Sequence, residues 1–254
     1  MANDTTSSKD LAPTGHVAIP FSAQQCSQDG KIHILLAASG SVATIKLPCI
    51  AERLGRHRNV SIRIILTKSA EKFLMGQSTE QPSLETLRQI PGVDAVYQDH
   101  DEWKNPWTRG MPILHIELRK WAHLLLVAPL SANTMAKMTM GFSDNLLLSV
   151  LRAWDTTGAV DSSSKKTKPI VLVAPAMNTA MWNHPITKKQ LTILRDEWGQ
   201  DDSTQEGWVS ILYPTEKTLA CGDNGIGAMM NWTEIVGAVE FHFGIGDSTL
   251  KHNS

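Results

Sequence analysis

The stretch LLLVAPLSANT, at residues 124–134, joins a purely apolar run to an end made of small and polar residues. A second stretch, IVLVAPAMNTAMW at residues 170–182, has the same arrangement. Continuous apolar strands are typical of parallel sheets that are buried on both faces, and ligands of such sheets bind at the carboxyl ends of the strands. Because both ends carry an asparagine, the pair predicts one polar ligand that is held from two sides.

Strands and helices alternate around these two stretches. Apolar runs at 31–37 and 60–66 predict two further strands, and a helix over 42–57 separates them. Residues 208–212 read as a last strand, and further helices are expected at 113–121, 132–140, 145–154, 185–198 and 234–243. This order predicts an α/β fold with a single-domain doubly wound parallel sheet, a Rossmann-like or flavodoxin-like sandwich.

Three segments lack a regular pattern. Residues 75–112 contain an acidic run and a tryptophan cluster, and we expect a long surface loop there. Residues 155–168 are rich in Ser and Lys and predict a flexible insertion. Gly222, Gly225 and Gly227 predict a mobile loop before the last helix.

The length of 254 residues suits one sizeable domain. We place this domain at residues 31–244, with a disordered N-terminal tail at 1–30 and a C-terminal tail at 245–254. The first 30 residues lack the basic start and apolar centre of a secretory signal.

The charge balance and the cysteine count exclude several functions. A formal net charge of −1 gives no basic surface for nucleic acid or anionic membrane, and no apolar run approaches the roughly 20 residues of a membrane span. The three cysteines, Cys26, Cys49 and Cys221, include no C-x-x-C pair, which argues against a disulfide framework or a structural zinc site. We therefore expect a cytoplasmic protein without a metal.

Gly40 and Ser41 stand where the first strand meets its helix. Such a turn can present backbone N–H groups and a hydroxyl to a phosphate, or it can serve only to reverse the chain. The chain has neither the G-x-G-x-x-G nor the G-x-x-x-x-G-K-[ST] pattern, so a mononucleotide phosphate fits better than a dinucleotide or ATP. Thr67 and Ser69, at the end of the neighbouring strand, favour the interpretation that the turn binds a phosphate.

Three further residues have two readings each. His115 is either structural or close to the polar strand ends, and no H-E-x-x-H or P-C-x-x-C pattern supports a metal there. Asn178 either binds a carboxylate or caps a helix, and spacing alone favours neither. Cys221 lies in a glycine-rich stretch, where a thiol is more accessible than in a buried helix or strand.

Five motifs in order give the chain a specific resemblance. They are Gly40-Ser-Val, LHIELR at 114–119, PLSANT at 129–134, PAMNTAMW at 175–182 and ACGD at 220–223. The chain from about Lys31 to Phe243 resembles the homo-oligomeric flavin-containing cysteine decarboxylase family, and within it the phosphopantothenoylcysteine decarboxylases. The insertion at 155–168 is longer than in the shorter members of that family.

The resemblance implies FMN as cofactor and assigns roles to residues of this chain. FMN would be bound by Gly40, Ser41, Val42, Thr67, Lys68, Ser69, Ser131, Ala132, Asn133, Thr134 and Ala176. Substrate would be bound by Asn178, Met181, Ala220 and Met229, the catalytic residues would be His115 and Cys221, and no metal would take part.

The resemblance also implies a reaction and an assembly. Oxidation of the cysteinyl thiol carbon would give a thioaldehyde, and loss of CO₂ would then give an ene-thiolate. Return of the electrons would give the product, 4′-phosphopantetheine, so the reaction would be a step of coenzyme A biosynthesis. His115 would assist the first step and Cys221 would donate the last proton. Members form homotrimers with FMN at the subunit interface and the histidine supplied by the neighbour.

Three rival functions are less well supported. A peptide cysteine decarboxylase of the same family lacks the Ala-Cys-Gly flap that this chain has at 220–222. A halotolerance-type regulatory subunit, which binds and inhibits a protein phosphatase and mixes with paralogues, commonly carries a long acidic tail, and the last residues here are Lys251 to Ser254. A flavodoxin-like electron carrier would need neither Asn178 nor Cys221.

Overall fold

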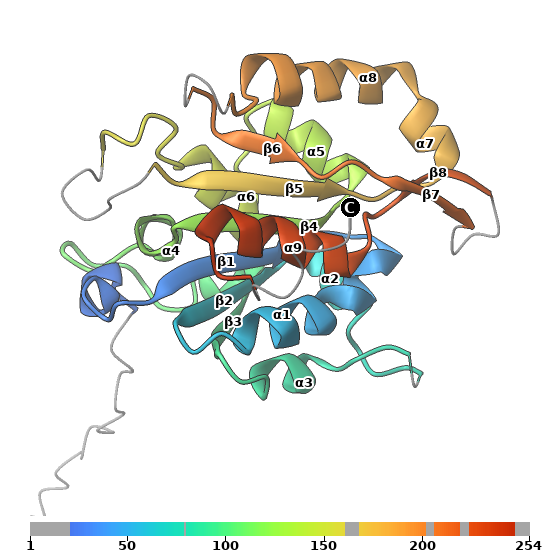
Figure 1. Cartoon of the computed structure of the whole chain (residues 1–254). Helices are drawn as coiled ribbons and strands as arrows, with labels where there is room; N and C mark the ends of the chain where they lie inside the picture. Colours follow the sequence, from blue (N-terminus) through green and yellow to red (C-terminus); the bar gives the residue numbers. More distant parts are fainter. Residues whose placement is uncertain (1–20, 79, 161–167, 202–205, 219–223, 247–254) are drawn as a thin grey trace, which may run out of the picture.

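The protein is described by a computed structural model that covers residues 21–78, 80–160, 168–201, 206–218 and 224–246. Its centre is a six-stranded sheet with the strand order β3-β2-β1-β4-β5-β6, in which each neighbouring pair is parallel (Figure 1). The strands are β1 (Ile32–Ala38), β2 (Val60–Leu66), β3 (Val93–Gln98), β4 (Leu124–Leu130), β5 (Ile170–Pro175) and β6 (Val209–Ile211). This order confirms the predicted α/β doubly wound sheet.

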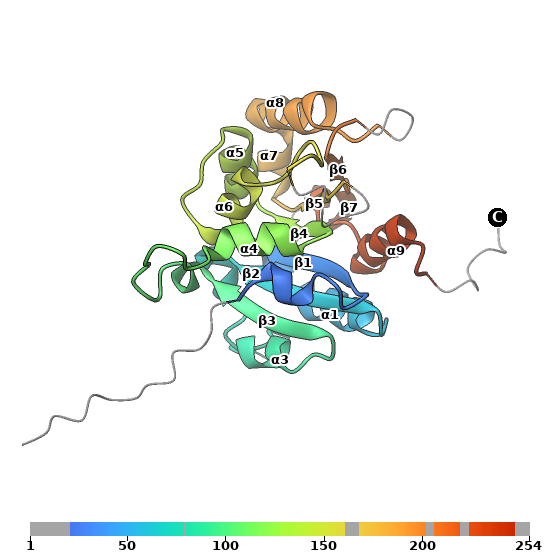
Figure 2. The same ribbon diagram turned by 90° about the vertical axis from the view of Figure 1, so that its left-hand side faces the viewer.

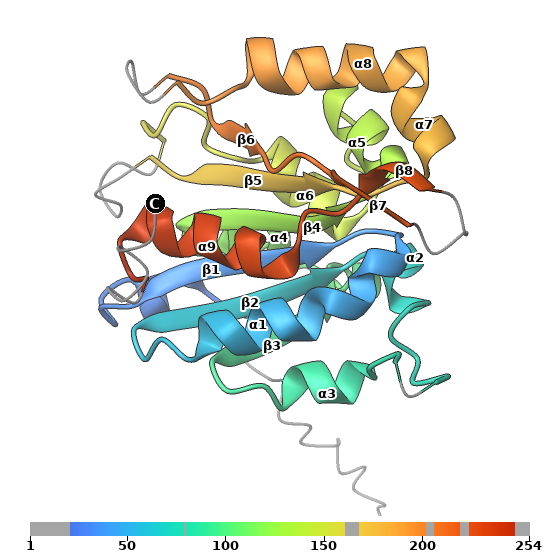
Figure 3. The same cartoon turned by 45° about the vertical axis from the view of Figure 1, so that its right-hand side comes forward.

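Helices cover both faces of the sheet. One face carries α1 (Leu47–Gly55), α3 (Leu84–Arg88) and α9 (Trp232–Phe243), and the other carries α4 (Leu114–Trp121), α5 (Ala132–Thr139), α6 (Leu146–Arg152) and α8 (Pro185–Thr192). The view in Figure 2 separates α4, α5 and α6 from α1 and α9, with the sheet between them. In Figure 3 the helices α1 and α9 lie in front of the strands.

Because helices cover both faces of the sheet, its strands are mostly apolar. In β1, Leu36 and Ala38 join the core under α1 and α9, whereas Leu35 and Ala37 join the core under α4 and α6. Both faces of the strand are therefore buried, and alternation of apolar with polar residues disappears. Among the described residues, no helix has the length and apolar character that a membrane crossing requires.

The short elements lie mostly at the ends of the strands. They are η1 (Ala23–Cys26), η2 (Val42–Lys46), α2 (Lys68–Glu71), η3 (Asp99–Asp101), α7 (Thr179–Asn183), the π-helical turn η4 (Ile193–Glu197) and the hairpin strands β7 (Thr215–Thr218) and β8 (Asn224–Ala228). The two hairpin strands are antiparallel and form a separate sheet.

Two sequence predictions are wrong about regular structure. The supposed loop at 75–112 contains α3, the edge strand β3 and η3. Strand β3 was missed because it is only partly buried along its whole length and so lacks a continuous apolar run. The strand predicted at 208–212 is present as β6, but it is not the last strand, because β7 and β8 follow it. Gly225 and Gly227, which were predicted to lie in a mobile loop, are part of β8.

The domain also begins before residue 31, where the sequence analysis placed its N-terminal boundary. Residues 21–30 pack on the domain: Phe21 meets the ring of Trp121 edge-on, and the guanidinium carbon of Arg63 lies 3.8 Å from the centroid of the Phe21 ring. The amide of Ala23 donates to the Glu117 carboxylate over 2.8 Å. Residues 1–20 and 247–254, and half of the predicted insertion (161–167 of 155–168), lie outside the described residues.

One buried hydroxyl joins the ends of β1 and β4. Ser39 is fully buried, its Oγ donates to the carbonyl of Pro129 over 3.0 Å, and the same Oγ accepts from the amide of Ser131 over 2.7 Å. The amide of Ser39 also donates to Pro129 O over 3.0 Å. These bonds fix where each strand ends relative to the other.

We expect Ser39→Ala to lower the free energy of unfolding by about 1–3 kcal/mol, because the buried amide of Ser131 loses its acceptor. Urea unfolding followed by circular dichroism measures this change. Ser143→Ala, which removes an exposed hydroxyl, is the matched control and should shift stability by less than about 0.5 kcal/mol. Equal stability of the two variants would contradict the bridging role of Ser39.

Candidate functional site

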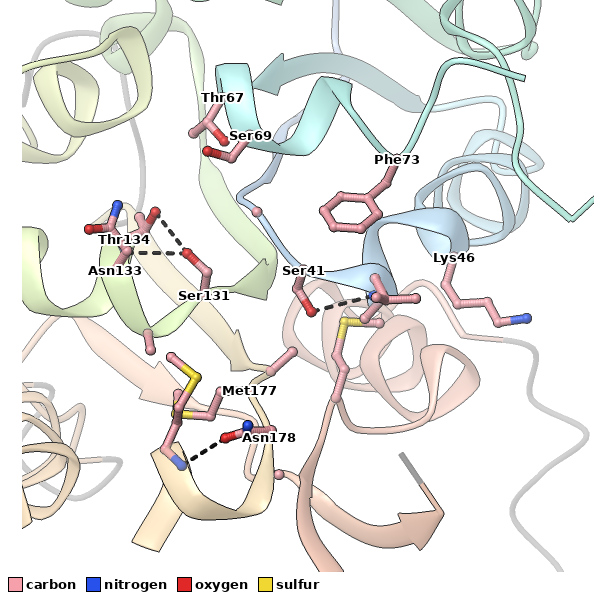
Figure 4. Close-up of a pocket in the computed structure, with 18 of the residues that line it drawn as sticks. Ser41, Lys46, Thr67, Ser69, Phe73, Ser131, Asn133, Thr134, Met177 and Asn178 are labelled. Carbon is pink, nitrogen blue, oxygen red and sulfur yellow. Dashed lines mark hydrogen bonds between the residues drawn. The ribbon is translucent and has the colours of Figure 1, made fainter. Parts of the chain in front are cut away.

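A cavity of about 830 Å³ opens at the carboxyl ends of the central strands (Figure 4). Its walls come from the segments that follow β1, β2, β4 and β5, and from the end of β8 and the start of α9. The strand order reverses direction between β1 and β4, and doubly wound sheets bind ligands at this switch point. The volume lies in the range of small-molecule and cofactor sites.

Most of the residues singled out in the sequence line this one cavity. They are Gly40, Ser41, Val42, Thr67, Lys68, Ser69, Ser131, Ala132, Asn133, Thr134, Ala176, Asn178, Met181 and Met229. His115 is not among the lining residues of its own chain. Ala220 and Cys221 lie outside the described residues, so the structure gives no position for the predicted flap.

The turn after β1 forms one end of the cavity. A Cβ on Gly40 would come within 2.5 Å of the Ser69 Cβ, so only glycine lets these two segments approach. The Ser41 side chain accepts from the amide of Ala43 over 3.4 Å, a long bond. Among the described residues, the amides of Ser41 and Val42 have no acceptor, so both can donate to a ligand.

Three strand ends share a second feature, a side-chain oxygen that caps the following helix. Thr67 accepts from Ala70 N over 3.3 Å, Ser131 from Thr134 N over 3.2 Å, and Asn178 from Met181 N over 2.8 Å. The interpretation of Asn178 as a helix cap is therefore confirmed. The cap uses only the Oδ1 atom, so the Nδ2 group of this exposed, cavity-lining side chain remains a donor (Figure 4).

The hairpin brings the chain back over the end of β5. The amide of Met177 donates to Gly227 O over 3.0 Å. Gly227 has a φ of 139°, and a Cβ there would meet Met177 O at 2.4 Å. Met177 and Met229 are buried and, with Phe73, give the cavity apolar walls. Figure 4 shows Met177 and Phe73 among the lining side chains. Apolar walls next to polar strand ends suit a ligand that has both an apolar part and a charged part.

The charges at the cavity favour an anion. Three lysines line it, Lys46, Lys68 and Lys137, against two aspartates. Lys137 forms an ion pair with Asp144. The Asp99 carboxylate accepts hydrogen bonds from the backbone amides of Lys68 and Leu146, over 3.1 Å and 3.3 Å. Among the described residues, neither Lys46 nor Lys68 forms an ion pair, so their ammonium groups are available for a ligand such as a phosphate.

Sequence reasoning missed several lining residues. Lys46 lies four residues after Val42 in the helix predicted over 42–57, so helical spacing could have found it, and Met230 directly follows the predicted Met229. Phe73 lies beyond the end of α2, and Asp99 comes from a segment with no comparable signal.

The comparisons with known proteins agree with this geometry. A family model described as "Flavoprotein" matches residues 22–243. A phosphopantothenoylcysteine decarboxylase from Arabidopsis thaliana is 43% identical over 200 residues, which cover 78% of this chain and 79% of that protein. Four other curated relatives are much longer proteins, and the chain spans only 29% to 41% of their length.

Two solved structures share the fold. A PPC decarboxylase mutant complexed with pantothenoylaminoethenethiol has a TM-score of 0.66 and 39% identity, with 84% of this chain and 99% of that chain covered. The FMN-binding protein AtHal3 has a TM-score of 0.65 and 38% identity, with 85% and 99% covered. By sequence and by fold, the chain belongs to the flavoprotein family, in the group that contains the phosphopantothenoylcysteine decarboxylases.

Proposed function

We propose that the protein decarboxylates 4′-phosphopantothenoylcysteine to 4′-phosphopantetheine with the help of FMN, a step of coenzyme A biosynthesis. One observation carries the proposal: three of the five motifs shared with this enzyme family, those that begin at Gly40, Pro129 and Pro175, line a single cavity together with residues 67–69, so that four strand ends meet there. The decarboxylases among the relatives in sequence and structure support the same reaction.

The described residues fit FMN. The FMN phosphate would lie at the turn after β1, where Gly40 has no side chain and the amides of Ser41 and Val42 are unpaired. The Lys68 ammonium adds positive charge there. Residues 131–134 and Ala176 would lie along the ring. The name of the FMN-binding protein with the same fold supports this choice of cofactor.

Bound FMN would supply a two-electron acceptor for the cysteinyl thiol carbon and a donor for the product. Asn178 then has a role of its own, because its Nδ2 group can hold the substrate carboxylate without adding a positive charge. A cation at this position would stabilise the carboxylate in the ground state and oppose the loss of CO₂. Met181 and Met229 would cover the carboxylate end and exclude water.

His115 and Cys221 would handle the protons. We propose that His115 accepts a proton during oxidation of the substrate, and that Cys221 donates one to the product. Because His115 does not line the cavity of its own chain, it would serve the cavity of a neighbouring copy in a homotrimer. The exposed rings of Trp103 and Trp107, shortly before His115 in the chain, supply apolar surface for such a contact.

The reaction is tested by mixing the purified, FMN-loaded protein with 4′-phosphopantothenoylcysteine without oxygen. We expect the yellow colour to bleach and then return, with one CO₂ and one 4′-phosphopantetheine formed for each substrate consumed. The substrate analogue in which serine replaces cysteine is the control and should leave the colour unchanged. Persistent yellow colour without CO₂ release from the cysteine substrate would contradict the proposal.

Gly40→Ala should weaken FMN binding by about 10-fold or more, because the added methyl pushes Ser69 away from the phosphate site. Quenching of flavin fluorescence during titration of the apoprotein gives the dissociation constant. Gly237→Ala adds a methyl where no atom lies within 4 Å and should bind FMN as the unmodified protein does. If both variants bind FMN normally, the phosphate does not lie at Gly40.

Two substitutions separate the two roles of Asn178. Asn178→Asp retains a capping oxygen and should leave the free energy of unfolding within about 0.5 kcal/mol, whereas Asn178→Ala should lower it by about 1 kcal/mol. Both should reduce kcat/KM on the order of 100-fold, because a hydrogen bond to the substrate carboxylate is lost. High activity in Asn178→Asp would show that this residue serves only as a cap.

A further inference from the structure

Glu102 is a buried acid outside the cavity that holds the proposed catalytic histidine by two bonds. Its side chain is 5% exposed, and it directly follows η3. One carboxylate oxygen accepts from Nδ1 of His115 over 2.8 Å, and the other accepts from the backbone amide of His115 over 3.2 Å. The carboxylate therefore contacts both N–H groups of a single residue.

The bond to the backbone amide fixes where the carboxylate lies. His115 is the second residue of α4, and the capping position is Ile113, whose side chain makes no cap bond. The amides of the first turn have no partner within the helix, and the N-terminus of a helix attracts negative charge. Glu102, 13 residues away in the chain, supplies the missing acceptor.

The bond to the ring fixes the tautomer. A carboxylate only accepts hydrogen bonds, so Nδ1 of His115 must carry the proton. In the neutral ring the lone pair is then on Nε2, for which the described part of the chain offers no partner. The His115 side chain is 22% exposed, so part of it reaches the surface. A ring in this state can accept a proton at Nε2.

The segment before Glu102 is itself anchored. The carboxylate of Asp99 accepts from the amides of Lys68 and Leu146, at the starts of α2 and α6. The amide of Gln98 donates to Asp101 over 2.8 Å. Asp99 thus ties the start of this segment to α2 and α6, three residues before Glu102.

We propose that Glu102 is the positioning residue of the decarboxylation: it holds His115 in the tautomer that leaves Nε2 free to accept the proton from substrate. The proposal rests on the proposed function for its catalytic consequence, and on the two hydrogen bonds for its geometry. Glu102 contacts neither substrate nor cofactor and acts through His115, as the carboxylate of a hydrolase triad acts through its histidine.

Glu102→Gln is the sharpest test, because the backbone amide of His115 dictates which way the new side chain lies. The amide oxygen of glutamine must face that N–H group, so its NH₂ group faces Nδ1 and donates to it. The proton of His115 then moves to Nε2. Long-range proton–nitrogen NMR spectra of the apoprotein with isotope-labelled histidine report the tautomer, and His115→Asn identifies the His115 signals.

We expect the Nδ1–H tautomer in the unmodified protein and the Nε2–H tautomer in Glu102→Gln. In the FMN-loaded variant, kcat should fall by about 100-fold with little change in KM, the low end of what a general base contributes. Glu52→Gln, the same change on the exposed surface of α1, is the matched control and should alter neither the spectrum nor kcat.

Two results would overturn the positioning role. One is an Nε2–H tautomer in the unmodified apoprotein, a measurement that requires neither the folding of the variant nor any activity. The other is a Glu102→Gln protein with the reversed tautomer and full kcat. If the tautomers are as expected but the unmodified protein releases no CO₂, the proposed function fails and the hydrogen-bond geometry stands.

Discussion

A parallel sheet that is covered on both faces buries most of the side chains of its strands, so polar groups gather at the strand ends, and the rest of this molecule follows from that constraint. The core strands β1 and β4 are apolar except for His33, because α1 and α9 cover one face and α4 and α6 the other. The chain turns polar where each strand ends, and the four ends meet at one edge. Ser39 holds two of these ends in a fixed relation.

The same polar residues perform two tasks at this edge. Thr67, Ser131 and Asn178 cap helices, and each also lines the cavity. Because capping fixes the side chain by a bond to the backbone, the remaining donor or acceptor is presented in one orientation. A motif such as PAMNTAMW therefore specifies a local structure and a binding group at once, which explains why Asn178 could be read in either way from the sequence.

The parts of the fold that the sequence predicted are those with a local signal. Strands β4 and β5 are continuous apolar runs, β1 is interrupted only by His33 and β2 only by Ser61 and Arg63, and the predicted limits of β2 match the structure at both ends. Strand β3 is partly exposed and mixes Asp94 with apolar residues, so its pattern resembles a surface loop. The packing of residues 21–30 depends on the contacts of Phe21 with Trp121 and of Ala23 with Glu117. Each contact joins residues that lie about 100 positions apart, so no local pattern encodes it.

The residues of the candidate site also fall into two groups, those that the sequence predicted and those that it could not. Motif residues at the strand ends could be predicted, because the topology of a parallel sheet brings such ends together. Asp99 and Glu102 could not, because they act through contacts with α2, α4 and α6 that depend on the path of the missed segment. The acidic run that suggested a solvated loop is in fact bound to the starts of three helices.

The central claim is that the carboxyl edge of the sheet holds FMN with its phosphate at the turn after β1. A crystal structure of the protein grown with FMN tests this most directly. The account predicts phosphate oxygens within hydrogen-bond distance of the amides of Ser41 and Val42, and the ring between residues 131–134 and Met229. A flavin bound elsewhere, or a cavity that stays free of flavin at saturating concentration, would contradict it.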